Sequence, residues 1–253
     1  RGSTPRGASR SVRVSTGSSA YASLRPGVPT AQPGTTLAAT WISDKLDNAD
    51  ECSVGRATEE GCAVEIRDVA DGLWIWRLEH PAWTPGGDWD PLVTSTCVRS
   101  EGEVILLDPL APREGGAELW ARLDADPPTV VAVLKPDHVR DVDLFVRRYG
   151  ARAFGPELYW RDDVPGTELE PIYPESRLPG GLVALYDGRG RNETPVWVPS
   201  LRTLVFADAL TAPHGELLVW STRWHEERAL PALRVLLDLP FEHVIVSHGE
   251  PVH

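Results

Sequence analysis

The chain has 253 residues, of which 42% are hydrophobic, and a formal net charge of −12 at pH 7. This length accommodates one sizeable domain or two small ones. The negative charge argues against a nucleic-acid-binding or anionic-membrane-binding surface, and no run of 18 apolar residues indicates a membrane span.

The first 62 residues form a distinct N-terminal extension. Residues 1–43 contain five arginines and no acidic residue, so they carry a charge of +5 and leave −17 on the remainder. They are rich in Ser, Thr, Gly and Pro and lack hydrophobic periodicity, which predicts disorder over residues 1–62. The composition resembles an organellar transit peptide, and an extension without a folded role is the alternative that we favour.

The three cysteines are Cys52, Cys62 and Cys97, and none of them forms a CxxC motif. A Cys52–Cys62 disulfide is one alternative. The odd count and the lack of a clear secretion signal favour free thiols in a reducing compartment. We therefore expect a cytoplasmic protein.

Strand and helix patterns begin near residue 63 and define a predicted domain over residues 63–253. Runs of apolar and β-branched residues predict strands at 63–66, 72–78, 92–98, 103–108, 129–134, 181–186, 195–198, 203–207 and 241–246. Apolar residues at helical spacing predict helices at 114–123, 139–149 and 226–237, with Gly150 as a C-cap and a break at Pro231. This order favours mixed sheets covered by helices. The chain has no GxGxxG, GxxxxGK[ST] or GxSxG motif, which weakens nucleotide-binding and serine-hydrolase interpretations.

Ionisable residues follow four of the predicted strands: Asp108, the loop 135–141, Asp208 and His248. Polar groups that converge at one edge of a sheet form a plausible site. Imidazole and carboxylate groups together suit Zn²⁺, Fe or Mn²⁺. A metal ion held there would acidify a bound water molecule for hydrolysis.

These pieces, in this order and spacing, resemble the metallo-β-lactamase superfamily over roughly residues 66–253. The resemblance implies an α+β fold, a four-layer αββα sandwich with its site at one edge of the two sheets. It matches Asp208 to the family's bridging aspartate and His248 to its last histidine. The usual C-terminal helix has no counterpart in this sequence.

The loop 135–141 departs from the family's H-x-H-x-D-H metal motif. The four ligand positions of that motif fall on Lys135, Asp137, Val139 and Arg140, while His138 lies between two of them. The family's further histidine, in a glycine-rich turn, has no counterpart in residues 187–194. Val139 offers no ligand atom, and two cationic side chains raise the electrostatic cost of a metal ion. A dinuclear centre is therefore not expected.

Two functions remain open. The first is hydrolysis of a small ester, thioester or amide, with His138 and Asp208 as catalytic residues and one Zn, Fe or Mn ion. The metal ligands would then come from Asp137, His138, Asp208 and His248. The second is a non-catalytic pseudoenzyme that binds a small anionic ligand or a protein partner. Its ligand would contact Lys135, Arg140 and Trp83, with further charge from Arg189 and Arg191.

Structural roles compete with both functions. Asp137 follows a proline and precedes a predicted helix, so it is a candidate N-cap. Asp108 is expected to orient neighbouring groups rather than bind a ligand. The sequence does not predict the oligomeric state.

Overall fold

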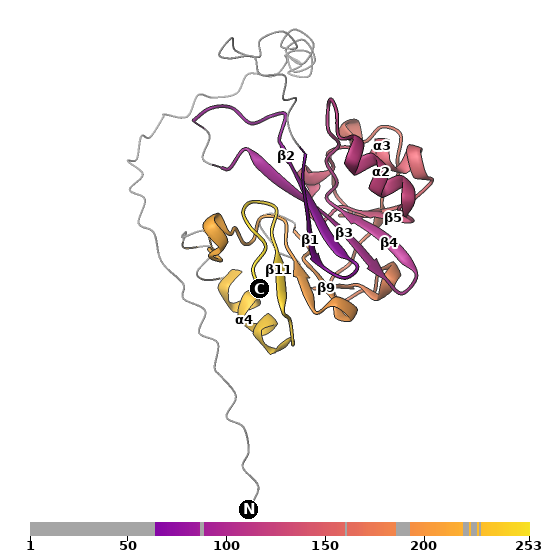
Figure 1. Cartoon of the computed structure of the whole chain (residues 1–253). Helices are drawn as coiled ribbons and strands as arrows, with labels where there is room; N and C mark the ends of the chain where they lie inside the picture. The colour runs from indigo at the N-terminus through magenta and orange to yellow at the C-terminus, as the bar shows by residue number, and fades with distance from the viewer. Residues whose placement is uncertain are drawn as a thin grey trace, which may run out of the picture. The chain divides into compact units, whose positions relative to one another are not determined.

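The computed structural model describes residues 64–86, 89–159, 161–185, 193–219, 223, 227 and 229–253 (Figure 1). Four of the sequence predictions lie outside these residues: the extension 1–62, the Cys52–Cys62 pair, Arg189 and Arg191. No helix in the described part of the chain is both long and apolar enough to cross a membrane.

The first sheet has seven strands in the order β1-β2-β3-β4-β5-β6-β7. Its strands are β1 (Glu65–Ala70), β2 (Leu73–Glu79), β3 (Leu92–Ser100), β4 (Glu103–Leu107), β5 (Val130–Ala132), β6 (Arg152–Gly155) and β7 (Glu170–Pro171). The first four pair antiparallel, whereas β4 to β7 pair parallel. Parallel neighbours need a crossover connection. The helices α2 (Ala117–Ala125) and α3 (Val142–Tyr149) lie in two of these crossovers.

The second sheet has four strands in the order β11-β10-β9-β8. They are β8 (Val183–Ala184), β9 (Val196–Val198), β10 (Thr203–Val205) and β11 (His243–Ile245). Strand β11 pairs parallel with β10, and α4 (Leu230–Val235) precedes it in the chain. Pro231 stands in the first turn of α4, where its missing N–H costs no hydrogen bond.

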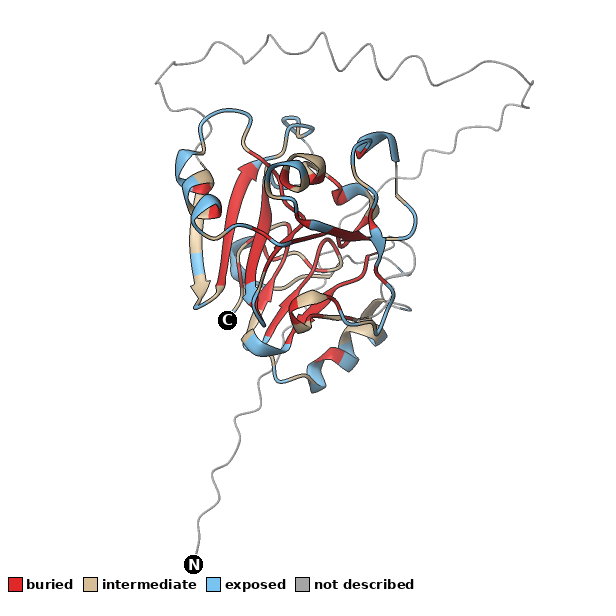
Figure 2. Ribbon diagram, turned by 90° about the vertical axis from the view of Figure 1, so that its right-hand side faces the viewer, coloured by how far each residue is buried: buried red, intermediate tan, exposed pale blue. Residues whose placement is uncertain are grey.

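Alternate residues of β4 face two different hydrophobic clusters. Leu106 packs with Leu119 of α2 and Phe145 of α3, whereas Ile105 packs with Val205 of the second sheet. A third cluster joins the second sheet to the segment around α4. Figure 2 shows that the buried residues are concentrated on the strands, while the helices expose much of their surface. The expected α+β fold with two sheets is confirmed, and it places the carboxyl ends of β4, β5, β10 and β11 around one site.

The structure corrects two local predictions. Asp137 is not the N-cap of α3, because it lies inside a separate 3₁₀ turn, Pro136–His138, and Asp141 holds the N-cap position. Strands β6 and β7 were not predicted. In contrast, Gly150 does end α3 in the left-handed conformation, with φ 68°.

Candidate functional site

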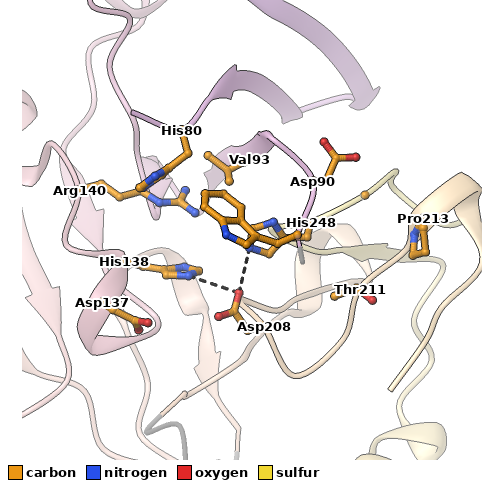
Figure 3. A pocket seen from close by; sticks show the side chains of 12 residues that line it. His80, Asp90, Val93, Asp137, His138, Arg140, Asp208, Thr211, Pro213 and His248 are labelled. Atoms are coloured by element: carbon orange, nitrogen blue, oxygen red, sulfur yellow. Dashed lines mark ion pairs between the residues drawn. The ribbon is translucent and has the colours of Figure 1, made fainter. Parts of the chain in front are cut away.

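A cavity of about 450 Å³ opens beside the carboxyl ends of β4, β5, β10 and β11. Its lining combines apolar, aromatic, imidazole and charged side chains. The lining residues are His80, Trp89, Asp90, Val93, Asp137, His138, Arg140, Asp208, Thr211, Pro213, His248 and Gly249. Figure 3 shows His138 and His248 pointing toward Asp208.

Asp208, which follows β10, is the centre of the polar cluster. Its Oδ1 lies 3.4 Å from His138 Nε2 and 3.4 Å from His248 Nε2. Its Oδ2 lies 3.0 Å from Lys135 Nζ. Burial alone would raise the pKa of Asp208, but the two imidazoles and the ammonium group hold it well below its usual value. The carboxylate is therefore ionised throughout the physiological range.

His138 is oriented by Asp108. Asp108 directly follows β4 and has φ 48°, a left-handed conformation that Asp tolerates better than most residues. Its Oδ1 accepts a hydrogen bond from the Leu134 N–H (2.8 Å), and its Oδ2 lies 2.8 Å from His138 Nδ1. Burial and the nearby Arg140 lower the pKa of His138, but Asp108 and Asp208 more than offset them, and the pKa lies above its usual value. The expected orienting role of Asp108 matches this geometry.

Lys135 and Arg140 are the two cations of the site, and both contact other protein groups. The Lys135 ammonium lies between the carboxylates of Asp137 and Asp208. Arg140 Nη1 donates hydrogen bonds to Thr94 O (3.1 Å) and Asp108 O (2.7 Å). Arg140 Nη2 donates to Ser247 Oγ at 2.7 Å, so one guanidinium joins the ends of β3, β4 and β11.

The remaining expected site residues are placed less centrally. The Asp137 side chain is 63% exposed, lies at the cavity rim and contacts Lys135. Trp83 is not among the residues that line the cavity. Instead, its Nε1 donates a hydrogen bond to Trp89 O (3.0 Å), and the Trp89 ring lies 5.4 Å from the His248 ring, centroid to centroid.

Two site residues were missed at the level of the sequence. His80 lines the cavity, and burial together with the charge of Arg140 lowers its pKa to about 4. Glu193 is buried directly behind Asp208, and desolvation raises its pKa to about 7. His80 directly follows β2 and Glu193 precedes β9, but neither residue lies in a recognisable motif. No sequence signal therefore distinguished them from other His and Glu residues.

The dinuclear metal centre of the resembled family does not fit these side chains. Two of its ligand positions hold Lys135 and Arg140, whose positive charges repel a second cation. Within the described ranges, no group of three or more His, Cys, Asp or Glu side chains is arranged to hold a metal ion. His138 and His248 do converge on Asp208, but an ammonium group already pairs with that carboxylate.

The arrangement of the two sheets is that of the metallo-β-lactamase fold, as solved structures show. One is the metallo-β-lactamase FIM-1 from Pseudomonas aeruginosa in its mono-zinc form. It is 17% identical, with 77% of this chain and 92% of that chain covered and a TM-score of 0.57. Another is a metallo-β-lactamase from Pontibacter korlensis, at 16% identity, 75% and 93% coverage and a TM-score of 0.55.

A metallo-β-lactamase family protein from Thermus thermophilus also matches, at 18% identity, 73% and 76% coverage and a TM-score of 0.51. No protein-family model and no curated protein matches the sequence. At these identities the likeness establishes the fold of the chain. The expected metallo-β-lactamase resemblance is therefore confirmed at the level of the fold, and the function must be argued from the site.

Proposed function

We propose that this protein binds a small molecule at a metallo-β-lactamase-type site whose positive charges come from Lys135 and Arg140 instead of metal ions. The observation that carries this proposal is the buried contact of 3.0 Å between Lys135 Nζ and Asp208 Oδ2. It supports a pseudoenzyme, because the carboxylate matched to the bridging aspartate already has a cationic partner.

Electrostatics and hydrogen bonding favour this arrangement. A divalent ion placed beside Asp208 would lie close to the Lys135 ammonium, in a buried region where repulsion is poorly screened. The guanidinium of Arg140 supplies the cross-link between strand ends that a metal ion provides in a metal site. The chain's own cations thus stabilise the ionised Asp208.

The cavity beside this cluster has the size and lining of a small-molecule site. Trp89, Val93 and Pro213 supply apolar surface, while His80 and Thr211 supply polar groups. The lining also contains the carboxylates of Asp90, Asp137 and Asp208 but a single guanidinium. Two of these carboxylates, Asp137 and Asp208, pair with the Lys135 ammonium, so the charges around the cavity nearly cancel. This balance favours a neutral ligand over the anionic one considered from the sequence.

A one-metal hydrolase acting on a small ester, thioester or amide is the second candidate. It is favoured by the equal distances of 3.4 Å from Asp208 Oδ1 to His138 Nε2 and to His248 Nε2. Two imidazole nitrogens and one carboxylate oxygen are a ligand set that zinc accepts. This candidate requires the Lys135 ammonium to leave Asp208.

Metal analysis separates the two candidates. The protein is incubated with zinc, passed through a desalting column and analysed for zinc per chain. His248→Ala removes one nitrogen ligand from the cluster around Asp208. The control is His243→Ala, because the exposed pair of His243 and His253, with Nδ1 atoms 2.8 Å apart, could hold zinc adventitiously. The proposal expects His248→Ala to leave the zinc content unchanged. About one zinc per chain, lost in His248→Ala and kept in His243→Ala, would overturn the proposal and leave the one-metal hydrolase as the candidate.

A further inference from the structure

Glu193 has a carboxylate that is buried and fully engaged by the backbone. The residue is 1% exposed. Its Oε1 accepts a hydrogen bond from the Ala207 N–H (2.8 Å), and its Oε2 accepts from the N–H groups of Asp208 (2.9 Å) and Ala209 (2.6 Å). One side chain therefore holds three consecutive peptide groups of the turn that presents Asp208.

The segment that carries Glu193 also contacts the opposite loop. The N–H of Thr194 donates a hydrogen bond of 2.8 Å to Leu134 O, one residue before Lys135. Glu193 and Thr194 thus connect the two loops that meet in the Lys135–Asp208 ion pair. Because hydrogen-bond geometry is directional, this connection constrains where the Asp208 carboxylate lies relative to the ammonium.

We infer that Glu193 is a positioning residue that sets the Asp208 carboxylate against Lys135. The inference rests on the geometry of the turn, and it deepens the proposed function only by naming what holds its central ion pair. The zinc content of the protein tests the proposed function, whereas the reactivity of Lys135 tests the inference, so the failure of one can be distinguished from the failure of the other.

The three backbone N–H groups of Ala207, Asp208 and Ala209 require a carboxylate at position 193. A carboxylate presents two acceptor oxygens, whereas an amide presents one oxygen and an NH₂ group. In Glu193→Gln, the NH₂ group would face at least one backbone N–H of the turn. A buried donor would lose its acceptor, and the turn would shift to relieve the clash.

Labelling of Lys135 tests the inference. The chain has two lysines, Lys45 and Lys135, so acylation by an N-hydroxysuccinimide ester can be followed at each by peptide mass spectrometry, with Lys45 as the internal reference. We expect Glu193→Gln to accelerate labelling of Lys135 about tenfold, as expected when one buried hydrogen bond is lost. The matched control Glu170→Gln, on an exposed strand position, should leave the rate unchanged.

A second arm separates positioning from general loosening. Asp208→Asn removes the charge that Glu193 is inferred to position, so adding Glu193→Gln to it should change Lys135 labelling less than about twofold. An equal acceleration with and without Asp208→Asn would overturn the inference, as would no acceleration in the single variant. If Glu193→Gln does not fold, Glu193→Asp keeps two acceptor oxygens on a shorter side chain, and the same two comparisons apply to it.

Discussion

The ammonium of Lys135 and the carboxylate of Asp208 form an ion pair of 3.0 Å in which the two side chains are only 7% and 12% exposed. Removing one member of such a pair leaves a buried charge without its partner. We expect Lys135→Met, which keeps most of the side-chain volume, to lower the free energy of unfolding by about 3 kcal/mol. Urea denaturation followed by tryptophan fluorescence measures this loss.

Arg147→Met is the control for the Lys135 variant. Arg147 also pairs with an aspartate, Asp143 at 3.6 Å, but its side chain is 66% exposed. Surface pairs of this kind contribute about 0.5 kcal/mol or less. Equal losses in the two variants would contradict the role assigned to the buried pair.

Arg140 should not be replaceable by lysine. Its planar guanidinium reaches Thr94 O, Asp108 O and Ser247 Oγ at once, and a single ammonium group cannot reproduce that fork. We expect Arg140→Lys to lower the free energy of unfolding by about 2 kcal/mol, while Arg147→Lys changes it little. If Arg140→Lys left the free energy of unfolding unchanged in the same denaturation experiment, the three hydrogen bonds would be dispensable.

The sequence allowed the strands around the site to be predicted because their signals are local. The segment that became β4 is almost continuously apolar and ends in Asp108, and the same holds for the strand before Asp208. Strands β6 and β7 escaped prediction because they have only four and two residues, too few for a pattern of alternation to be recognised. Strand β7 even contains Pro171, a residue that sequence patterns count against a strand.

The site itself was predictable only in part. The strand ends indicated that Asp208 and His248 would lie close together, and they do. The contacts that define the cluster are non-local, however. Glu193 reaches the turn at Asp208 from the segment before β9. Arg140 joins three strand ends through a long side chain that makes three hydrogen bonds. Neither residue type nor spacing encodes such contacts.

Gly249 should be essential for the placement of His248. Its φ is 117°, and a Cβ atom added there would lie 2.3 Å from the backbone carbonyl of Ala212. Gly249→Ala therefore combines backbone strain with a clash, and we expect it to lower the free energy of unfolding by about 3 kcal/mol. The clash should also displace the His248 ring, which a change in its imidazole NMR signals would report.

Gly215→Ala is the matched control for Gly249→Ala. Gly215 has a φ of 77°, but an added Cβ would meet nothing within 4 Å. Only the strain of the left-handed conformation remains, at about 1 kcal/mol. If the free energy of unfolding falls by the same amount in both alanine variants, the close approach to Ala212 does not contribute to the destabilisation.

His80 should make the stability of the protein depend on pH between about 4 and 6.5. Burial and the positive charge of Arg140 lower its pKa in the folded state to about 4, from an ordinary value of 6.5. Above pH 6.5 the imidazole is neutral in both the folded and the unfolded chain, and its contribution to stability is complete. As the pH falls from 6.5 to 4, the unfolded chain binds the proton first and the free energy of unfolding decreases.

The variant His80→Asn isolates this contribution from the other titrating groups of the cavity. Its amide oxygen can replace His80 Nδ1, which accepts a hydrogen bond of 3.2 Å from the Ala82 N–H, without binding a proton. We expect the difference in unfolding free energy between wild type and His80→Asn to shift by about 1–2 kcal/mol from pH 7 to pH 4, after allowance for solvent screening of a partly exposed group. Because protonation of His80 opposes folding, the wild type must be the protein that loses more stability at low pH. A constant difference across this range would mean that His80 titrates normally, and that the cavity does not exclude its charged form.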